Sequence, residues 1–215
     1  MSETNCKEVS RKEKNINKVV HVALASFVKY GIDGSKVSEI GRIARLTERS
    51  VFRYFDTKSD LVLAAAMLFW DKVKTLVLKN MDEIENSNKT GLEEIEIILR
   101  KYTDIYFTHY KQFIFVHEAE SYLYRSGKDL LIKNHVLSPF ATSEDPVALA
   151  IKKGIKDGSV NSDINIENAY FNTYDSLLGL MEKFAITRTE DKDEEKVIMS
   201  RLNDFCHTLT LSFKK

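Results

Sequence analysis

The sequence of 215 residues contains only two prolines, eight glycines and two cysteines, and each scarcity argues against a class of protein. Because tight turns depend on proline and glycine, so few of them disfavour an all-β fold with many short strands. Cys6 and Cys206 stand at opposite ends of the chain, without a spacing typical of a metal or redox site. The longest apolar run, Leu61–Trp70, is far too short to cross a bilayer. Met1–Lys14 is polar and charged, so we expect no signal peptide and a cytoplasmic protein without a membrane partner.

The sequence also lacks the motifs by which many catalytic sites are recognised. It has no glycine-rich phosphate loop, no nucleophile elbow, and no paired carboxylates or Cys/His cluster at a known spacing. We therefore expect a protein that is not an enzyme and that uses no cofactor or metal. Its composition, 43% hydrophobic and 30% charged, is that of a chain able to bury a core.

The formal net charge is zero, but the charges are unevenly distributed. Residues 1–60 hold 12 lysines and arginines against 8 acidic residues, while the rest of the chain holds 20 against 24. A basic N-terminal segment on an acidic body is expected of a protein whose front end meets phosphate. Chance clustering of solvated charges would give the same counts, so this observation does not establish DNA binding.

Hydrophobic residues recur at helical spacing along most of the chain, which predicts an all-α fold of about nine helices. We expect a flexible tail over 1–14, a DNA-binding domain over 15–56, and a ligand-sensing and dimerisation domain over 57–215. Residues 126–142 show too little periodicity for an assignment. The expected helices cover 16–31, 37–44, 47–55, 58–81, 91–110, 112–125, 146–157, 165–186 and 191–213, with N-terminal caps at Thr47, Thr57, Thr90 and Asn165.

The first three helices have the pattern of a helix-turn-helix unit. Val37, Ile40 and Ala44 form one inward stripe on the second helix, where Gly41 permits a close crossing. Val51 and Phe55 face inward on the third helix, which predicts an outward surface suited to a DNA major groove. That surface consists of Glu48, Arg49, Phe52 and Arg53.

The segment Phe27–Leu61, FVKYGIDGSKVSEIGRIARLTERSVFRYFDTKSDL, resembles the DNA-binding signature of the TetR family of bacterial repressors. The resemblance extends from about Ile16 to Leu68. It implies phosphate contacts by Thr47, Tyr54 and Lys58, backbone contacts near the second helix, and contacts of the third helix with base edges or adjacent phosphates. The implied DNA-binding residues are Ser35, Lys36, Thr47, Glu48, Arg49, Ser50, Phe52, Arg53, Tyr54 and Lys58.

Three positions depart from the family pattern. Lys36 replaces the usual threonine cap, so Ser35 is expected to cap the second helix instead. Arg45 replaces the usual turn glycine, and a left-handed backbone there would cost about 1 kcal/mol or more. Phe52 replaces a frequent tyrosine and loses a phosphate-bonding hydroxyl, although a thymine methyl contact could substitute. Arg49, Arg53 and Lys58 remain open to an alternative role as solvated charges, and Tyr54 to one in packing.

The larger domain is expected to form a homodimer and to bind an unidentified small-molecule effector. The last two helices each carry an apolar face that is a candidate for the dimer interface. Either face could instead be interior to one subunit. The first face comprises Ala169, Phe171, Tyr174, Leu177, Leu178 and Met181, and the second comprises Val197, Ile198, Leu202, Phe205, Leu209 and Leu211. Polar-tipped aromatic residues crowd the middle helices, and the resemblance to the TetR family implies that this region surrounds an effector cavity. A buried Glu118 there would favour a cation. The expected ligand-binding residues are Tyr102, Tyr106, His109, Tyr110, Phe113, His117, Glu118, Tyr122 and Tyr174.

Other interpretations remain open. Most of these aromatic residues could be ordinary core or surface side chains. A metal site from His109, His117 and Glu118 is disfavoured, because adjacent residues lie on different faces of a helix. The favoured function is a repressor that binds a double-stranded palindromic operator and leaves it when the effector binds. The rivals are a TetR-like protein controlled by a protein partner or by nothing, and a helical scaffold or enzyme that does not bind DNA.

Overall fold

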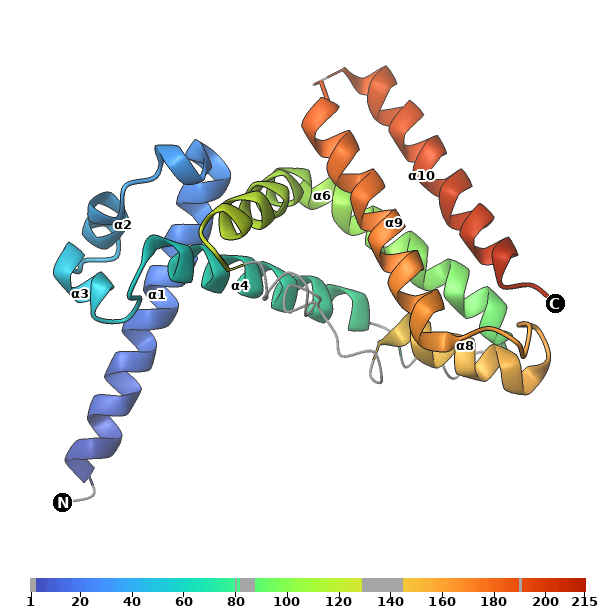
Figure 1. Ribbon diagram of the computed structural model, residues 1–215, viewed down its shortest axis with the longest axis horizontal. Coiled ribbons are helices and arrows are strands. Elements are labelled where there is room, and N and C mark those ends of the chain that lie inside the picture. Colours follow the sequence, from blue (N-terminus) through green and yellow to red (C-terminus); the bar gives the residue numbers. More distant parts are fainter. Residues whose placement is uncertain (1–2, 80, 82–87, 129–144, 190) are drawn as a thin grey trace. The chain divides into compact units, whose positions relative to one another are not determined.

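The computed structural model describes residues 3–79, 81, 88–128, 145–189 and 191–215, and within these ranges the chain is helical (Figure 1). The one extended pairing among the described residues is an isolated antiparallel bridge between Val160 and Lys214. The all-α prediction is confirmed, and the eight described helices agree with the expected number of about nine. They are α1 (Glu3–Gly34), α2 (Val37–Ile43), α3 (Glu48–Phe52), α4 (Lys58–Leu78), α6 (Gly91–Arg125), α8 (Pro146–Asp157), α9 (Ile166–Thr187) and α10 (Lys192–Ser212).

Two elements differ most from the expected limits. Helix α1 already begins at Glu3 rather than near Ile16, so most of the expected tail is helical. The two helices expected over 91–110 and 112–125 form the single element α6, whose helical geometry is interrupted at His109 (φ −133°, ψ 23°). The unassigned segment 126–142 lies almost entirely outside the described residues.

Several helices begin with the side-chain capping bonds that the sequence predicted. The Thr57 amide donates to Asp60 Oδ2 (2.9 Å) and the Asp60 amide donates back to Thr57 Oγ1 (3.3 Å). Thr90 and Glu93 form the same reciprocal capping box. Asn165 caps α9 by accepting from the Asn168 amide (2.9 Å). These bonds satisfy amide groups that a helix N-terminus otherwise leaves without partners.

The chain divides into two compact units, and the limits between them fall inside α4 and α6. Unit 1 comprises the described parts of 1–72 and 114–138; unit 2 comprises those of 73–113 and 139–215. This grouping places the second half of α6 with the N-terminal helices. The functional limits at 14 and 56 stay a prediction.

Unit 1 is built around the inward face of α1. Ala23 and Phe27 are buried there, and the Phe27 ring stacks on Phe115 of α6 with centroids 5.7 Å apart. Helix α1 is kinked at Gly31, whose φ of +72° lies in a region that favours glycine. The burial of Ile40 on α2 and Val51 on α3 joins the two short helices to this core.

Unit 2 contains the first half of α6 together with α8, α9 and α10. Its core includes Ile95 and Leu99 of α6, Leu177 of α9 and Leu202 of α10, all buried. Helices α6 and α8 approach so closely at Gly91 that a Cβ there would lie 2.1 Å from the Gly154 amide nitrogen. No helix among the described residues is long and apolar enough to cross a membrane.

Candidate DNA-binding interface and effector region

Helix α3 presents the outward surface expected of a recognition helix. Thr47 caps it by accepting from the Ser50 amide (3.1 Å). Val51 is 1% exposed, whereas Phe52 is 40% exposed. Phe55 lies beyond the end of α3 and is half-buried rather than fully inward. The outward residues Glu48, Arg49, Phe52 and Arg53 are all exposed, as the pattern predicted.

The turn between α2 and α3 is tight. The Leu46 amide donates to the Gly41 carbonyl (2.8 Å), and a Cβ on Gly41 would lie 3.1 Å from the Leu46 carbonyl oxygen and 3.3 Å from Val51 Cγ2. The close crossing expected at Gly41 is therefore confirmed. Arg45 has a φ of +60°, so the left-handed conformation considered for this position is also present. An arginine in the left-handed region has a steric cost that a glycine avoids.

The Tyr54 hydroxyl joins the end of α3 to α1. It accepts hydrogen bonds from Asn15 Nδ2 (3.3 Å) and Arg53 Nη2 (3.4 Å). The bond from Asn15, then that from Arg53, lowers the pKa of Tyr54, and the charge of Lys12 adds to the effect. Sequence reasoning missed Asn15 because it stands 39 positions before Tyr54 and belongs to no motif.

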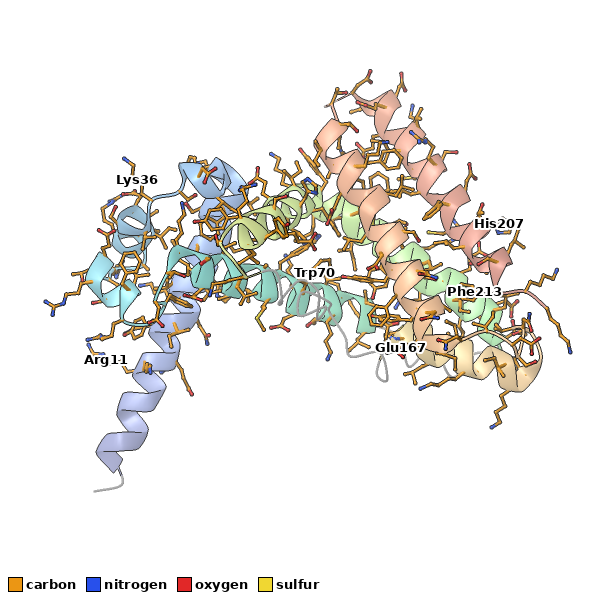
Figure 2. All side chains as sticks on the ribbon, in the orientation of Figure 1. Arg11, Lys36, Trp70, Glu167, His207 and Phe213 are labelled. Atoms are coloured by element: carbon orange, nitrogen blue, oxygen red, sulfur yellow. The ribbon has the colours of Figure 1, made fainter. Side chains whose placement is uncertain are left out.

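Three residues expected at the DNA backbone differ in their environment. Ser35 is buried, accepts from Ser26 Oγ (2.9 Å) and donates to the Gly31 carbonyl (2.8 Å), so its hydroxyl is used inside unit 1. The expectation that Ser35 caps α2 is wrong, because the cap residue is Lys36 and it makes no side-chain capping bond. Lys36 is exposed (Figure 2). Lys58 Nζ donates to the Ile32 carbonyl (2.5 Å), and burial lowers its pKa.

The residues expected to bind an effector are divided between the two units. In unit 2, Tyr102, Tyr106 and Phe113 are buried, and the Tyr106 and Phe113 ring centroids lie 5.9 Å apart. The Tyr102 ring meets Tyr174 edge-on at 6.5 Å. His109 and Tyr110 are half-buried, and the Arg188 guanidinium lies 4.3 Å from the Tyr110 ring centroid.

Buried acidic groups accompany these aromatic residues in unit 2. Burial raises the pKa of Asp145 to about 6 and that of Glu182 to about 7. Asp145 Oδ1 caps α8 by accepting from the Val147 amide (2.7 Å), while Asp145 Oδ2 is buried without a hydrogen-bond partner among the described residues. The Tyr102 hydroxyl is also buried without a hydrogen-bond partner among the described residues. Burial raises the pKa of Tyr102, and the charge of Asp145 raises it further. Sequence reasoning missed Asp145. The signal that could have found it was Pro146, which marks the start of a helix and so makes the preceding residue a candidate cap.

The other three expected ligand residues lie in unit 1. His117, Glu118 and Tyr122 line a cavity of about 290 Å³ between α6 and the Gly31–Gly34 end of α1. His117 and Glu118 are exposed, so the expectation of a buried Glu118 is wrong. Among the described residues, no group of three or more histidine, cysteine, aspartate or glutamate side chains could hold a metal ion.

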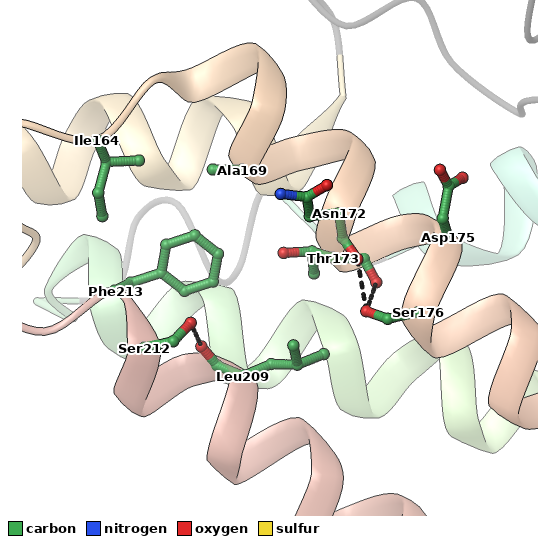
Figure 3. Close-up of a pocket in the computed structure, with 9 residues that line it drawn as sticks. All are labelled: Ile164, Ala169, Asn172, Thr173, Asp175, Ser176, Leu209, Ser212 and Phe213. Carbon is green, nitrogen blue, oxygen red and sulfur yellow. Dashed lines mark hydrogen bonds between the residues drawn. The ribbon is translucent and has the colours of Figure 1, made fainter.

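The apolar faces expected on α9 and α10 are partly interior to unit 2. Leu177, Met181, Ile198 and Leu202 are buried, which agrees with the alternative that these faces form the core of one subunit. The outer side of the two helices carries two hollows, of about 670 and 600 Å³. Figure 3 shows the first, where Leu209, Ser212 and Phe213 from the end of α10 lie opposite α9. Gly179 and Phe205 line the second.

Comparisons with known proteins agree with this architecture. Residues 19–69 match the sequence model of the bacterial regulatory proteins of the tetR family. A chain from Mesorhizobium loti MAFF303099, described as a TetR-family transcriptional regulator, superposes with a TM-score of 0.72 at 12% identity, over 95% of this chain and 99% of the other. The fatty acid degradation regulator FadR of Bacillus halodurans gives 0.64 at 13% identity, over 91% and 94%.

FadR of Bacillus subtilis, solved in complex with stearoyl-CoA, gives a TM-score of 0.62 at 13% identity, over 90% of this chain and 96% of the other. No curated protein sequence matches this chain. The front helices are a helix-turn-helix module of the TetR type, so the resemblance in Phe27–Leu61 is confirmed. The chain as a whole has the fold of TetR-family transcriptional regulators.

Proposed function

We propose that this protein is a transcriptional repressor that binds a palindromic operator as a homodimer and leaves it when a small-molecule effector binds. The observation that carries the proposal is the exposed surface of α3, where Arg49, Phe52 and Arg53 project outward from a capped helix anchored by Val51. An arginine can bind a guanine edge through two hydrogen bonds, and an aromatic side chain can contact a thymine methyl group.

The contacts proposed for the DNA backbone are those of exposed or half-exposed polar groups. Thr47, Ser50, Tyr54 and Lys36 are available for phosphate. Lys58 lies at the start of α4, and its ammonium donates a hydrogen bond to the Ile32 carbonyl. We therefore propose that its main role is to hold α1 and α4 together and that a phosphate contact is secondary. Ser35 is left out of the proposed contacts because its hydroxyl is bonded inside unit 1.

A dimer is proposed because one short recognition helix buries too little surface for tight, specific binding. Two such helices about 34 Å apart would read successive major-groove half-sites. The outer side of α9 and α10 supports this assembly, since Val197 and Leu211 are exposed there and hollows beside Gly179 and Leu209 are open to a second pair of helices.

We infer that the effector binds in unit 2, among Tyr102, Tyr106 and Tyr174. Buried aromatic rings with polar tips suit an amphipathic ligand, and the unpartnered Tyr102 hydroxyl and Asp145 Oδ2 would orient it through hydrogen bonds. Helix α4 crosses the limit between the units at Lys72–Val73 and would transmit the change to the DNA-binding helices. A coupling of about 1–3 kcal/mol is typical of such regulation.

The test is binding of the purified protein to the DNA upstream of its own gene, over a series of salt concentrations. We expect tight binding that weakens steeply with salt and is abolished in Arg49→Ala/Arg53→Ala. Lys152→Ala/Lys156→Ala, which removes two exposed charges of α8, is the matched control and should bind as the wild type does. Weak binding that is indifferent to sequence and to Arg49 and Arg53 would contradict a repressor acting at that site.

The effector is tested on the same complex. Stearoyl-CoA is the first probe, because FadR of Bacillus subtilis is described in complex with it. Uncharged aromatic compounds form a second set, chosen for the buried tyrosines of unit 2. Release of DNA by a probe in the wild type, but not in Tyr102→Ala, supports the proposed site. Robust DNA binding that no small molecule alters would contradict the effector part alone.

A further inference from the structure

Helix α1 continues beyond the helix-turn-helix module. Figure 1 shows its N-terminal turns extending past the short helices α2 and α3, and Figure 2 labels Arg11 on this part of α1. Arg11, Lys12 and Lys18 are exposed there. Among residues 11–79, 88–128, 145–189 and 191–215, whose side chains the structure describes, no carboxylate is paired with any of these three cations. The feature is therefore a basic surface that the sequence motifs do not include.

The three cations gather on the side of α1 that carries Asn15. At 3.6 residues per turn, Arg11 lies about 40° from Asn15 around the helix axis, and Lys12 and Lys18 lie about 60° from it on either side. Glu13 lies about 160° away, on the opposite side of the helix. We call the surface formed by Arg11, Lys12 and Lys18 the α1 basic stripe.

The α1 basic stripe is continuous with the end of the recognition helix. Asn15, at its centre, donates to the Tyr54 hydroxyl, which also accepts from Arg53 (3.3 and 3.4 Å). The Arg53 guanidinium lies 5.4 Å from the centroid of the Tyr54 ring. The charge of Lys12 reaches Tyr54 as well, since it contributes to lowering the pKa of that hydroxyl after the bonds from Asn15 and Arg53. All these residues belong to unit 1.

We propose that the α1 basic stripe binds the phosphate backbone of double-stranded DNA next to the segment that α3 reads. This inference rests on the proposed function and adds a second element to the DNA interface. From Arg11 to Lys18 the helix rises about 10 Å, at 1.5 Å per residue. One DNA strand carries a phosphate about every 3.4 Å along the duplex axis, so the stripe matches roughly three phosphates.

The stripe adds affinity without adding sequence information. Lysine and arginine contacts to phosphate release condensed counterions and fix the orientation of a protein on the duplex, whereas base edges are read by other groups. The bonds at Tyr54 hold the stripe and α3 in one register. A protein in which the stripe is neutral is therefore expected to keep its sequence preference while losing affinity and salt sensitivity.

The experiment measures binding to a mixed-sequence duplex of about 30 base pairs, roughly three helical turns, by fluorescence anisotropy over a salt series. The full-length wild type is compared with Arg11→Ala/Lys12→Ala/Lys18→Ala. We expect the dependence of log K on log salt to become shallower by about 0.9 for each phosphate that the variant no longer neutralises, with binding weakened roughly tenfold or more near 0.1 M salt. Circular dichroism and urea unfolding check that the variant is folded.

Two further variants make the result specific. Arg11→Lys/Lys12→Arg/Lys18→Arg keeps the charges and should bind as the wild type does. Lys152→Ala/Lys156→Ala/Lys192→Ala removes three exposed charges of unit 2 and should leave the salt dependence unchanged. Wild-type behaviour of the Arg11/Lys12/Lys18 alanine variant on this duplex, together with abolished binding of Arg49→Ala/Arg53→Ala to the DNA upstream of the gene, would overturn the stripe and leave the proposed function standing. Absence of salt-dependent binding by the wild type, both to this duplex and to the DNA upstream of the gene, would overturn both.

Discussion

Asn15 donates a hydrogen bond from its side-chain amide to the hydroxyl of Tyr54, and so connects α1 to the second residue after the end of α3. The same hydroxyl accepts from Arg53, a residue of the proposed DNA-contacting surface. The position of α3 therefore depends on a contact with α1 as well as on the burial of Val51.

The coupling between Asn15 and Tyr54 is measurable. In a double-mutant cycle of Asn15→Ala and Tyr54→Phe, we expect an interaction energy of about 0.5–1.5 kcal/mol in urea unfolding, the net value of one hydrogen bond. Asn17→Ala, at an exposed position two residues later, is the control and should show no coupling with Tyr54→Phe. Strict additivity of the Asn15 and Tyr54 substitutions would contradict the contact.

Arg45 is expected to destabilise the protein through its backbone. Replacement by glycine removes the steric cost of a left-handed residue, about 1–2 kcal/mol, and adds the entropic cost of glycine, about 0.5–1 kcal/mol. Arg45→Gly should therefore raise the free energy of unfolding by about 0.5–1 kcal/mol, as measured by urea denaturation. Arg45→Ala removes the same side chain but keeps the left-handed cost, so it should give no such gain. Equal effects of the two substitutions would show that the side chain, not φ, matters.

Burial of Glu182 makes stability depend on pH. Its pKa is raised from 4.5 to about 7 in the folded protein, so the folded state keeps a proton that the unfolded state has already lost between these values. Since the folded state binds more protons there, stability should fall as the pH rises from about 4.5 to about 7. Glu182→Gln should therefore be more stabilising, relative to wild type, at pH 8 than at pH 5, by roughly 1–3 kcal/mol.

The control for this pH dependence is Glu167→Gln, an exposed position on the same helix. Its difference from the wild type gives the effect of replacing an exposed glutamate, and the Glu182→Gln difference is compared with it at each pH. Urea unfolding at the two values measures both substitutions. A Glu182→Gln effect that did not change with pH would show that Glu182 is ionised in the folded protein throughout.

Gly179 offers a test of the proposed dimer. A Cβ at this position meets nothing within 4 Å in the subunit, and the residue lines the outer hollow between α9 and α10. Gly179→Arg should therefore leave the subunit folded but obstruct the approach of a second pair of helices, giving monomers in analytical ultracentrifugation and weaker DNA binding. Leu149→Arg, at an exposed position on α8, should remain dimeric. A dimeric Gly179→Arg variant would exclude this face as the interface.

The sequence alone determined the elements of the helix-turn-helix module and their order. Thr47 and Asn165 cap helices in the structure as they were expected to, and Gly41 makes the close approach inferred for it. These features depend on residue spacing and on hydrogen bonds between residues a few positions apart. They can therefore be predicted from short segments of the sequence. The resemblance raised the possibility of a left-handed Arg45 in place of the usual turn glycine, and the structure gives this residue a positive φ.

Only the tertiary structure decided which distant residues share an environment. It assigned His117, Glu118 and Tyr122 to unit 1 but Tyr102 and Tyr174 to unit 2, although all five were expected to bind one effector. It buried Leu202 and exposed Val197 on the same helix, and it paired Asn15 with Tyr54. Hydrophobic periodicity gives the face of a helix that is buried, but which neighbour covers that face depends on packing between segments far apart in the sequence.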